Sequence, residues 1–283
     1  MSDQAWPKQQ AALPSAVPRP RRSWDPSLLV WVAAGAILLF LVVNPLVRLV
    51  LVSFSQPRGQ GFTLANYVAA YSRERYLAAL GNSLVLGFGA AALGALFGLP
   101  MAWAVARTDM PGKRVVWASV LGAFVVPPYL GAVAWILLAG PNAGWLNRLL
   151  AGLLGMAHGP FNVYSMPGLV LVVACSSYPY VFVFTQTALE RISTDMEDAA
   201  HILGAGAWRT TLRVTLPLAM PAILGALILV FLEAIALFGS PALIALPARF
   251  QVVTTQMWEF FEQPPRVQVA AAYAMPLLAV TVA

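Results

Sequence analysis

The chain has 283 residues, of which 60% are hydrophobic and only 10% are charged, and its formal net charge is +6. Soluble domains carry about 25% charged residues, so this composition excludes an ordinary soluble domain and predicts a polytopic membrane protein. The single cysteine, Cys175, excludes an intrachain disulfide and a cysteine metal cluster.

The first part of the chain predicts a tail followed by one membrane span. Residues 1–26 are rich in proline, alanine and charge, which is typical of a disordered tail. The apolar run Leu28–Phe54 is long enough to cross a bilayer and too long for a cleaved signal peptide. We therefore assign residues 27–79 to a first transmembrane helix and an external loop, on the periplasmic side if the tail is cytoplasmic.

Residues 80–283 predict one membrane domain with five further spans. The expected spans are Leu80–Ala106, Val115–Leu138, Pro167–Leu189, Leu218–Leu246 and Val267–Ala283. The first of these is dense in glycine, and small residues let helix backbones approach closely in lipid. Pro127 and Pro128 interrupt the Val115–Leu138 span. The last span is at the lower length limit and looks truncated, so the chain is a fragment or its natural form continues. The fold class expected is all-α, with six transmembrane helices.

The residues from Glu190 to Pro217, called here the polar segment, separate the fourth and fifth spans. Thr194 followed by Glu197 predicts a capping box and a helix that begins at Asp195. Its acids, Asp195, Glu197 and Asp198, lie in the first turn, where the helix dipole favours negative charge.

The second half of the polar segment predicts a turn and another short helix. Gly204 and Gly206 are expected to end the first helix in the left-handed conformation. A second helix is expected over Ala207–Thr215, with Pro217 stopping it. A DNA-binding helix-turn-helix is the alternative, but a membrane-tethered loop of mixed charge is a poor reader of duplex DNA. We expect no nucleic-acid partner.

The order of residues in the polar segment resembles one family. Asp198-Ala199-Ala200, then Gly204, then Val214-Thr215-Leu216-Pro217 is similar to the EAA loop of binding-protein-dependent ABC importer permeases. Asp198 stands where the family usually has glutamate, with Glu197 just before it. The resemblance implies a type I ABC transporter permease fold over residues 80–283, with the EAA loop at 190–217. The residues that it implies for coupling to an ATPase are Glu197, Asp198, Ala199, Ala200, Gly204, Leu216 and Pro217.

The same resemblance implies partners and a location. They are a cytoplasmic ABC ATPase dimer, a periplasmic substrate-binding protein, a second permease half that is fused or separate, and the lipid of the bacterial inner membrane. The chain itself is expected to be a transport subunit and not an enzyme, without a cofactor. Its only lysines, Lys8 and Lys113, lie outside any phosphate-binding glycine loop. His158 and His201 lie in separate loops, so no metal site is expected.

The distribution of lysine and arginine predicts the orientation. Ten of the 17 basic residues lie on the side of the tail and the polar segment, and seven lie on the other side. The densest clusters also lie on the tail side, so the positive-inside rule puts the N-terminus and the polar segment in the cytoplasm.

The cargo is indicated only by a shorter resemblance. The stretch Phe238–Phe250, followed by Val252-Val-Thr-Thr-Gln, is similar to ferric-iron permeases, in which two six-span halves are often fused. It implies ferric iron. Thiamine, polyamine or phosphonate-type solutes are the alternatives within the same importer class.

Glu233 is the one acid well inside an apolar span, where an ionisable group costs about 2.5–3.5 kcal/mol. It either lies on the translocation pathway or is protonated and hydrogen-bonded to a neighbouring helix; Gln186 and Asn82 are weaker cases.

Two other function classes fit less well. A secondary transporter would need more mid-membrane ionisable groups and inverted repeats, and an intramembrane enzyme would need a nucleophile or metal set.

Overall fold

The structure is a computed structural model that describes residues 26–56, 61–262 and 264–282. The chain divides after Arg48 into two compact units. The described part of the first unit is most of helix α1 (Pro26–Ser53), which is long and apolar enough to cross a membrane. The tail expected at residues 1–26 lies almost wholly outside the described residues.

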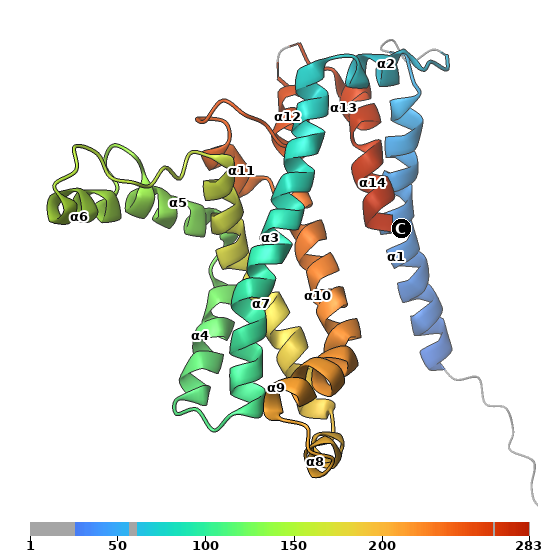
Figure 1. Cartoon of the computed structure of the whole chain (residues 1–283). Helices are drawn as coiled ribbons and strands as arrows, with labels where there is room; N and C mark the ends of the chain where they lie inside the picture. The colour runs from blue at the N-terminus through green and yellow to red at the C-terminus, as the bar shows by residue number, and fades with distance from the viewer. Residues whose placement is uncertain (1–25, 57–60, 263, 283) are drawn as a thin grey trace, which may run out of the picture. The chain divides into compact units, whose positions relative to one another are not determined.

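The second unit contains the remaining helices of the described chain (Figure 1). They are α2 (Ala65–Tyr71), α3 (Glu74–Arg107), α4 (Lys113–Val125), α5 (Pro128–Ala139), α6 (Trp145–Leu154), α7 (Met166–Arg191), α8 (Asp195–Ile202), α9 (Ala207–Thr210), the π-helical turn η1 (Thr211–Thr215), α10 (Leu216–Ala236), α11 (Gly239–Ile244), α12 (Val253–Glu259), α13 (Val267–Tyr273) and α14 (Met275–Val282). The all-α fold class is confirmed.

Helices α3, α7 and α10 pack together around the main apolar core, which includes Leu86, Val173, Val181 and Val230. Glycines on α3 make this packing close. A Cβ atom on Gly98 would lie 3.0 Å from the backbone oxygen of Tyr178 on α7. The glycine-rich span therefore brings backbones together as the sequence predicts.

Four helices of the described chain are long and apolar enough to span a membrane: Ser27–Ser53, Glu74–Arg107, Met166–Arg191 and Ala207–Ala236. The span expected over Val115–Leu138, with its interruption at Pro127 and Pro128, is the pair α4 and α5, bent by 103°. Pro127 and Pro128 cause the break, because neither ring nitrogen can donate a helical hydrogen bond and each restricts the residue before it.

The expected fifth span ends earlier than Leu246. Helix α10 stops at Ala236, and Leu237 is extended, with φ −68° and ψ 133°. Thr254 Oγ1 donates a hydrogen bond of 2.7 Å to the Leu237 carbonyl oxygen, which replaces a bond within the helix. The sixth expected span corresponds to α13 and α14, which form a shorter apolar segment, Val267–Val282.

Candidate functional site

The polar segment lies at one end of the packed helices. In Figure 1, α8 and α9 are at the same end as the C-terminus of α3, and α2 and α12 are at the opposite end. Arg107 is the last residue of α3 and Arg75 is its second, so the two arginines mark the two ends. At 1.5 Å per residue they are separated by about 48 Å along the helix axis.

Helix α8 begins at Asp195, as predicted, but the prediction of a capping box is wrong. Thr194 has helical dihedral angles (φ −65°, ψ −20°), and its side chain makes no capping hydrogen bond. Ser193 Oγ instead accepts a hydrogen bond of 3.2 Å from the backbone nitrogen of Asp195. The carboxylate of Glu197, which the capping box would use, is turned toward other partners.

Gly204 ends this helical turn as the sequence predicts. It has φ +84°, and the backbone nitrogen of Ala205 donates to the carbonyl oxygen of Ala200 at 2.9 Å. This is the glycine-dependent helix end, in which the left-handed residue redirects the chain. Gly206 has φ −72°, so its expected left-handed conformation is wrong; it is the N-cap of α9.

The helix that follows does not stop at Pro217. Residues Ala207–Ala236 form one continuous helical run, and Pro217 lies in the first turn of α10. Just before it, the helix widens into the π turn, where the backbone nitrogen of Leu216 donates to Thr211 O. Since Pro217 lacks an N–H, the missing bond is absorbed by a local π turn rather than by a helix end.

Glu197 joins three elements at this end of the molecule. Its Oε1 lies 3.0 Å from Arg107 Nε and accepts a 2.7 Å hydrogen bond from Thr215 Oγ1. Arg107 also donates through Nη2 to the carbonyl oxygen of Ile192, which follows α7, at 3.1 Å. The side chains of Arg107 and Glu197 are only 12% and 18% exposed. In the sequence, Arg107 stands out only as a basic loop residue.

The other implied coupling residues lie near this cluster with different exposure. Asp198 and Ala199 are exposed, Ala200 and Leu216 are partly buried, and Pro217 is exposed. No residue of α8 is buried. The most exposed large apolar side chains of the polar segment are Ile202 at 86%, Leu203 at 87% and Trp208 at 74%.

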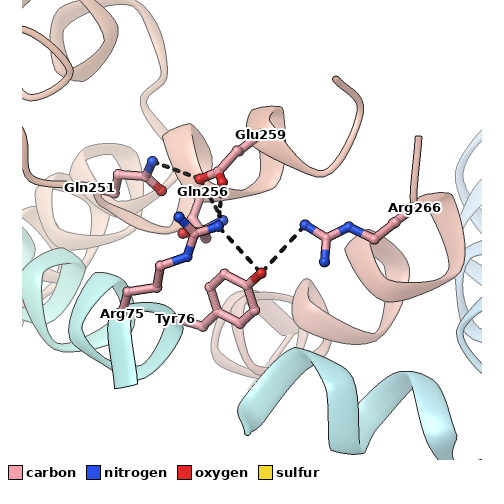
Figure 2. A network of polar contacts seen from close by, with 6 residues as sticks. All are labelled: Arg75, Tyr76, Gln251, Gln256, Glu259 and Arg266. Carbon is pink, nitrogen blue, oxygen red and sulfur yellow. Dashed lines mark hydrogen bonds and ion pairs between the residues drawn. The ribbon is translucent and has the colours of Figure 1, made fainter. Parts of the chain in front are cut away.

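A second polar cluster lies at the opposite end, around Glu259 of α12 (Figure 2). Arg75 of α3 forms an ion pair with its Oε1. Its Oε2 accepts hydrogen bonds from Gln251 Nε2 at 2.8 Å and Gln256 Nε2 at 3.1 Å. Burial raises the pKa of Glu259, but the hydrogen bonds from Gln251 and Arg75 outweigh it and hold that pKa below its ordinary 4.5. No motif in the sequence indicated this cluster.

The same cluster includes the hydroxyl group of Tyr76. Arg75 and Arg266 donate to it at 3.5 and 3.4 Å. The guanidinium carbon of Arg266 also lies 5.1 Å from the centre of the Phe260 ring, within cation–π distance. These contacts tie the start of α3 to α12 and to the residue before α13.

Glu233 lies in α10 and is partly buried, and its Oε2 accepts a 3.1 Å hydrogen bond from Ser177 Oγ of α7. The two weaker cases, Asn82 and Gln186, also have partners: Asn82 donates to Gln251 O at 2.8 Å, and Gln186 donates to Glu190. Among the described residues, no three His, Cys, Asp or Glu side chains could hold a metal ion.

A family model described as the inner membrane component of binding-protein-dependent transport systems matches residues 12–283. The chain belongs to this family. A relative named as the sulfate transport system permease protein CysW, from Synechococcus elongatus, is 29% identical over 222 residues, covering 77% of this chain and 73% of the relative. The molybdenum transport system permease protein ModB of Haemophilus influenzae is 29% identical over 189 residues, covering 65% and 80%.

Solved structures have the same fold. A chain of a bacterial ABC transporter that imports the polysaccharide alginate superposes with a TM-score of 0.72 at 20% identity, covering 90% of this chain and 92% of that one. The MetNI methionine transporter in an inward-facing conformation gives a TM-score of 0.56 at 15% identity, with coverages of 73% and 89%.

These comparisons confirm the resemblance to type I ABC importer permeases. The protein is a multi-pass inner-membrane permease subunit of a binding-protein-dependent ABC importer and not an enzyme, since ATP hydrolysis belongs to a separate subunit. Such permeases act with an ATPase and a substrate-binding protein. The narrower match to ferric-iron permeases gains no support, because the relatives above are named for sulfate and molybdenum.

Proposed function

We propose that α8 couples this permease to its ATPase dimer, on the cytoplasmic side of the membrane. The observation that carries the proposal is the exposure of α8, which has no buried residue although apolar side chains end it at Ile202 and Leu203. A contiguous exposed apolar surface beside charged residues is typical of a binding surface. The exposed acids Asp195 and Asp198 would fix its register on a basic rim of the ATPase.

The remaining residues of the EAA-like loop have supporting roles in this proposal. Ala199 and Ala200 let the ATPase approach the helix closely. Gly204 sets the direction of the chain after α8, and Leu216 and Pro217 begin α10, through which the movement reaches the membrane. A second permease half, fused or separate, would present an equivalent helix to the other ATPase subunit.

The orientation and the second partner follow from the same proposal. Four expected spans precede the polar segment if the bent pair α4 and α5 is one crossing, and this even number puts the N-terminus in the cytoplasm as well. The binding protein would then dock at the α12 end of the molecule, where Arg75, Tyr76 and Glu259 hold α3 and α12 together.

We infer that the cargo is a small inorganic oxyanion of the sulfate or molybdate class. The names of the relatives from Synechococcus and Haemophilus support it. Ferric iron is the second candidate, favoured by the Phe238–Phe250 stretch, which contains α11 and its flanking turns.

An uptake assay tests the cargo. Cells with the gene deleted and restored are given ³⁵S-sulfate, ⁹⁹Mo-molybdate or ⁵⁵Fe(III) after starvation for each nutrient. Loss and recovery of sulfate or molybdate uptake is expected, with iron uptake unchanged. Loss of iron uptake alone would overturn the oxyanion in favour of iron. Normal uptake of all three solutes would contradict both proposed cargoes.

A substitution of Glu233 distinguishes between the two proposed cargoes in the same uptake assay. An ionised carboxylate on the pathway would lower the entry barrier for a cation and raise it for an anion. We propose a pathway role for Glu233 only in the iron case. For an oxyanion its role is the hydrogen bond with Ser177 between α7 and α10. Glu233→Gln, which keeps a hydrogen-bonding group, should then leave oxyanion uptake within about twofold of wild type, whereas slowed iron uptake would support the pathway role.

A further inference from the structure

We propose that Glu197 is a positioning residue inside the permease and not a contact for the ATPase. Together with Arg107 and Thr215, it carries the movement of α8 to α3 and α10. This inference rests on the proposed coupling role of α8, and it assigns different roles to the two adjacent acids of the EAA-like loop.

The two acids point in different directions. Successive side chains of a helix are turned by about 100° from each other, so Glu197 and Asp198 point to different sides of α8. The Glu197 side chain is 18% exposed and is engaged by Arg107 and Thr215. Asp198 is exposed, and among the described residues none pairs with its carboxylate. The outward acid is therefore Asp198.

The environment of Glu197 makes its contacts strong. A single oxygen, Oε1, faces Arg107 Nε at 3.0 Å and Thr215 Oγ1 at 2.7 Å. The bond from Thr215 is a charge-assisted hydrogen bond, whereas the Arg107 contact is an ion pair in which Nε–H makes no hydrogen bond. Both interactions are stronger in a partly dehydrated site than at an open surface. Beside the cluster is a small cavity that Trp103, His201 and Thr210 also line, so the pair lies in a partly enclosed site rather than on a flat surface.

The side-chain contacts of Glu197 connect α8 to α10 without relying on the easily bent backbone between these two helices. Between α8 and α10 the backbone runs through the Gly204 turn, the short helix α9 and the π turn η1. A turn and a π-helical insertion are the places at which helices bend, so the backbone alone would transmit a displacement poorly. The Glu197–Thr215 hydrogen bond joins α8 directly to the last residue of η1, and the Glu197–Arg107 pair joins it to the end of α3.

Arg107 extends this connection to a third span. Its Nη2 donates to the carbonyl oxygen of Ile192, the residue that caps α7, at 3.1 Å. The side chains of Arg107 and Glu197 thus join α8 to the ends of α3, α7 and α10, which are the helices that form the main core. A displacement of α8 by the ATPase would reach all three helices through the side chains of Glu197, Arg107 and Thr215.

The test uses the complete importer, reconstituted in liposomes with its ATPase and binding protein. Two quantities are measured: the ATPase subunit retained when the permease is purified, and the cargo transported per ATP hydrolysed. Allosteric coupling corresponds to about 5–150-fold effects, so Glu197→Gln and Arg107→Gln should lower transport per ATP by about tenfold while retaining the ATPase. The exchange Arg107→Glu with Glu197→Arg should restore most of the coupling.

Asp198→Asn is the matched comparison on the same helix. It should weaken retention of the ATPase, which Glu197→Gln should leave intact. The inference is overturned if Glu197→Gln loses the ATPase as Asp198→Asn does, or if its transport per ATP equals that of wild type. A charge exchange that is folded but no better than the single variants would also overturn it.

A second variant keeps the test decisive if Glu197→Gln does not fold. Thr215→Val has nearly the same volume and removes only one hydrogen bond, so it should lower transport per ATP in the same direction but less. Unchanged coupling in Thr215→Val would then contradict the inference. If the proposed coupling function is itself wrong, the result is different: the wild-type chain would neither retain the ATPase nor transport cargo.

Discussion

At the residue scale, Glu259 illustrates how a carboxylate stabilises the α12 end of the molecule. Its carboxylate accepts from Gln251, Gln256 and Arg75, and it is held charged by them although burial disfavours the charge. Its pKa is lower in the folded protein than the ordinary 4.5. The charged Glu259 side chain therefore stabilises the folded protein at pH values above 4.5. This stabilisation is lost as the pH falls through the lower folded-state pKa of Glu259.

Glu259→Gln should lower the unfolding temperature at pH 7. The expected cost is about 1 kcal/mol, because Arg75 is half exposed and water weakens the ion pair. The difference from wild type should shrink as the pH falls below 4.5 and disappear below the lower folded-state pKa, where folded wild-type Glu259 is neutral as well. Fluorescence-detected melting of the detergent-purified protein measures both effects. Glu262→Gln, an exposed acid three residues away, is the control, and an equal effect there would contradict the assigned role.

Some residue-level features could be predicted from the sequence and others could not. The left-handed Gly204 could, because few other residues enter that conformation cheaply. The orientation of Glu197 could not, because Thr194 three residues earlier gave it an equally good local partner. Its real partners, Arg107 and Thr215, are 90 and 18 residues away in the sequence. Only the tertiary fold decides between them.

At the element scale, the packing of α3 against α7 depends on a glycine. A Cβ atom on Gly98 would lie 2.8 Å from Val181 Cβ and 3.0 Å from backbone atoms of Tyr178 and Phe182. Backbone cannot move aside as a flexible side chain can. The contact therefore fixes how closely the two helices approach.

Gly98→Val should destabilise the protein by about 3 kcal/mol, at the upper end of what overpacking costs. Its level in the membrane and its melting temperature should both fall. Gly81→Val is the matched control on the same helix, since a Cβ atom added there would meet no neighbouring atom within 4 Å. Equal losses in the two variants would point to helix propensity rather than to packing.

The prolines show that helix ends can be predicted from the sequence only in part. Pro127 and Pro128 break a helix as expected, because the two adjacent residues remove two donors and restrict Val126. Pro217 does not, because it lies in the first turn of α10 and the preceding π turn accommodates it. The sequence contains the proline in both cases, but the helical context on its N-terminal side determines the outcome.

At the scale of the whole molecule, the composition and one loop motif were enough to predict the family. Apolar runs predict spans because a bilayer requires about 20 apolar residues per helix. The EAA-like order in residues 198–217 identified the importer class, which the family match over residues 12–283 confirms. The cargo could not be predicted in this way, since the described residues contain no cluster of acids, histidines or cysteines that could hold a metal ion, and the motif itself says nothing of the solute.

The central claim is that α8 binds the ATPase in the cytoplasm, and site-directed cross-linking tests it most directly. Cys175 is first replaced by alanine, and a cysteine is introduced at Ile202, which is 86% exposed. Ser72→Cys, an exposed position at the opposite end of α3, is the control. A bifunctional thiol–amine reagent is then added to membranes that contain the assembled importer.

If α8 binds the ATPase, a covalent adduct should form between Ile202→Cys and the ATPase, and none from Ser72→Cys. In the transporting complex, an adduct from Ser72→Cys and none from Ile202→Cys would contradict this claim.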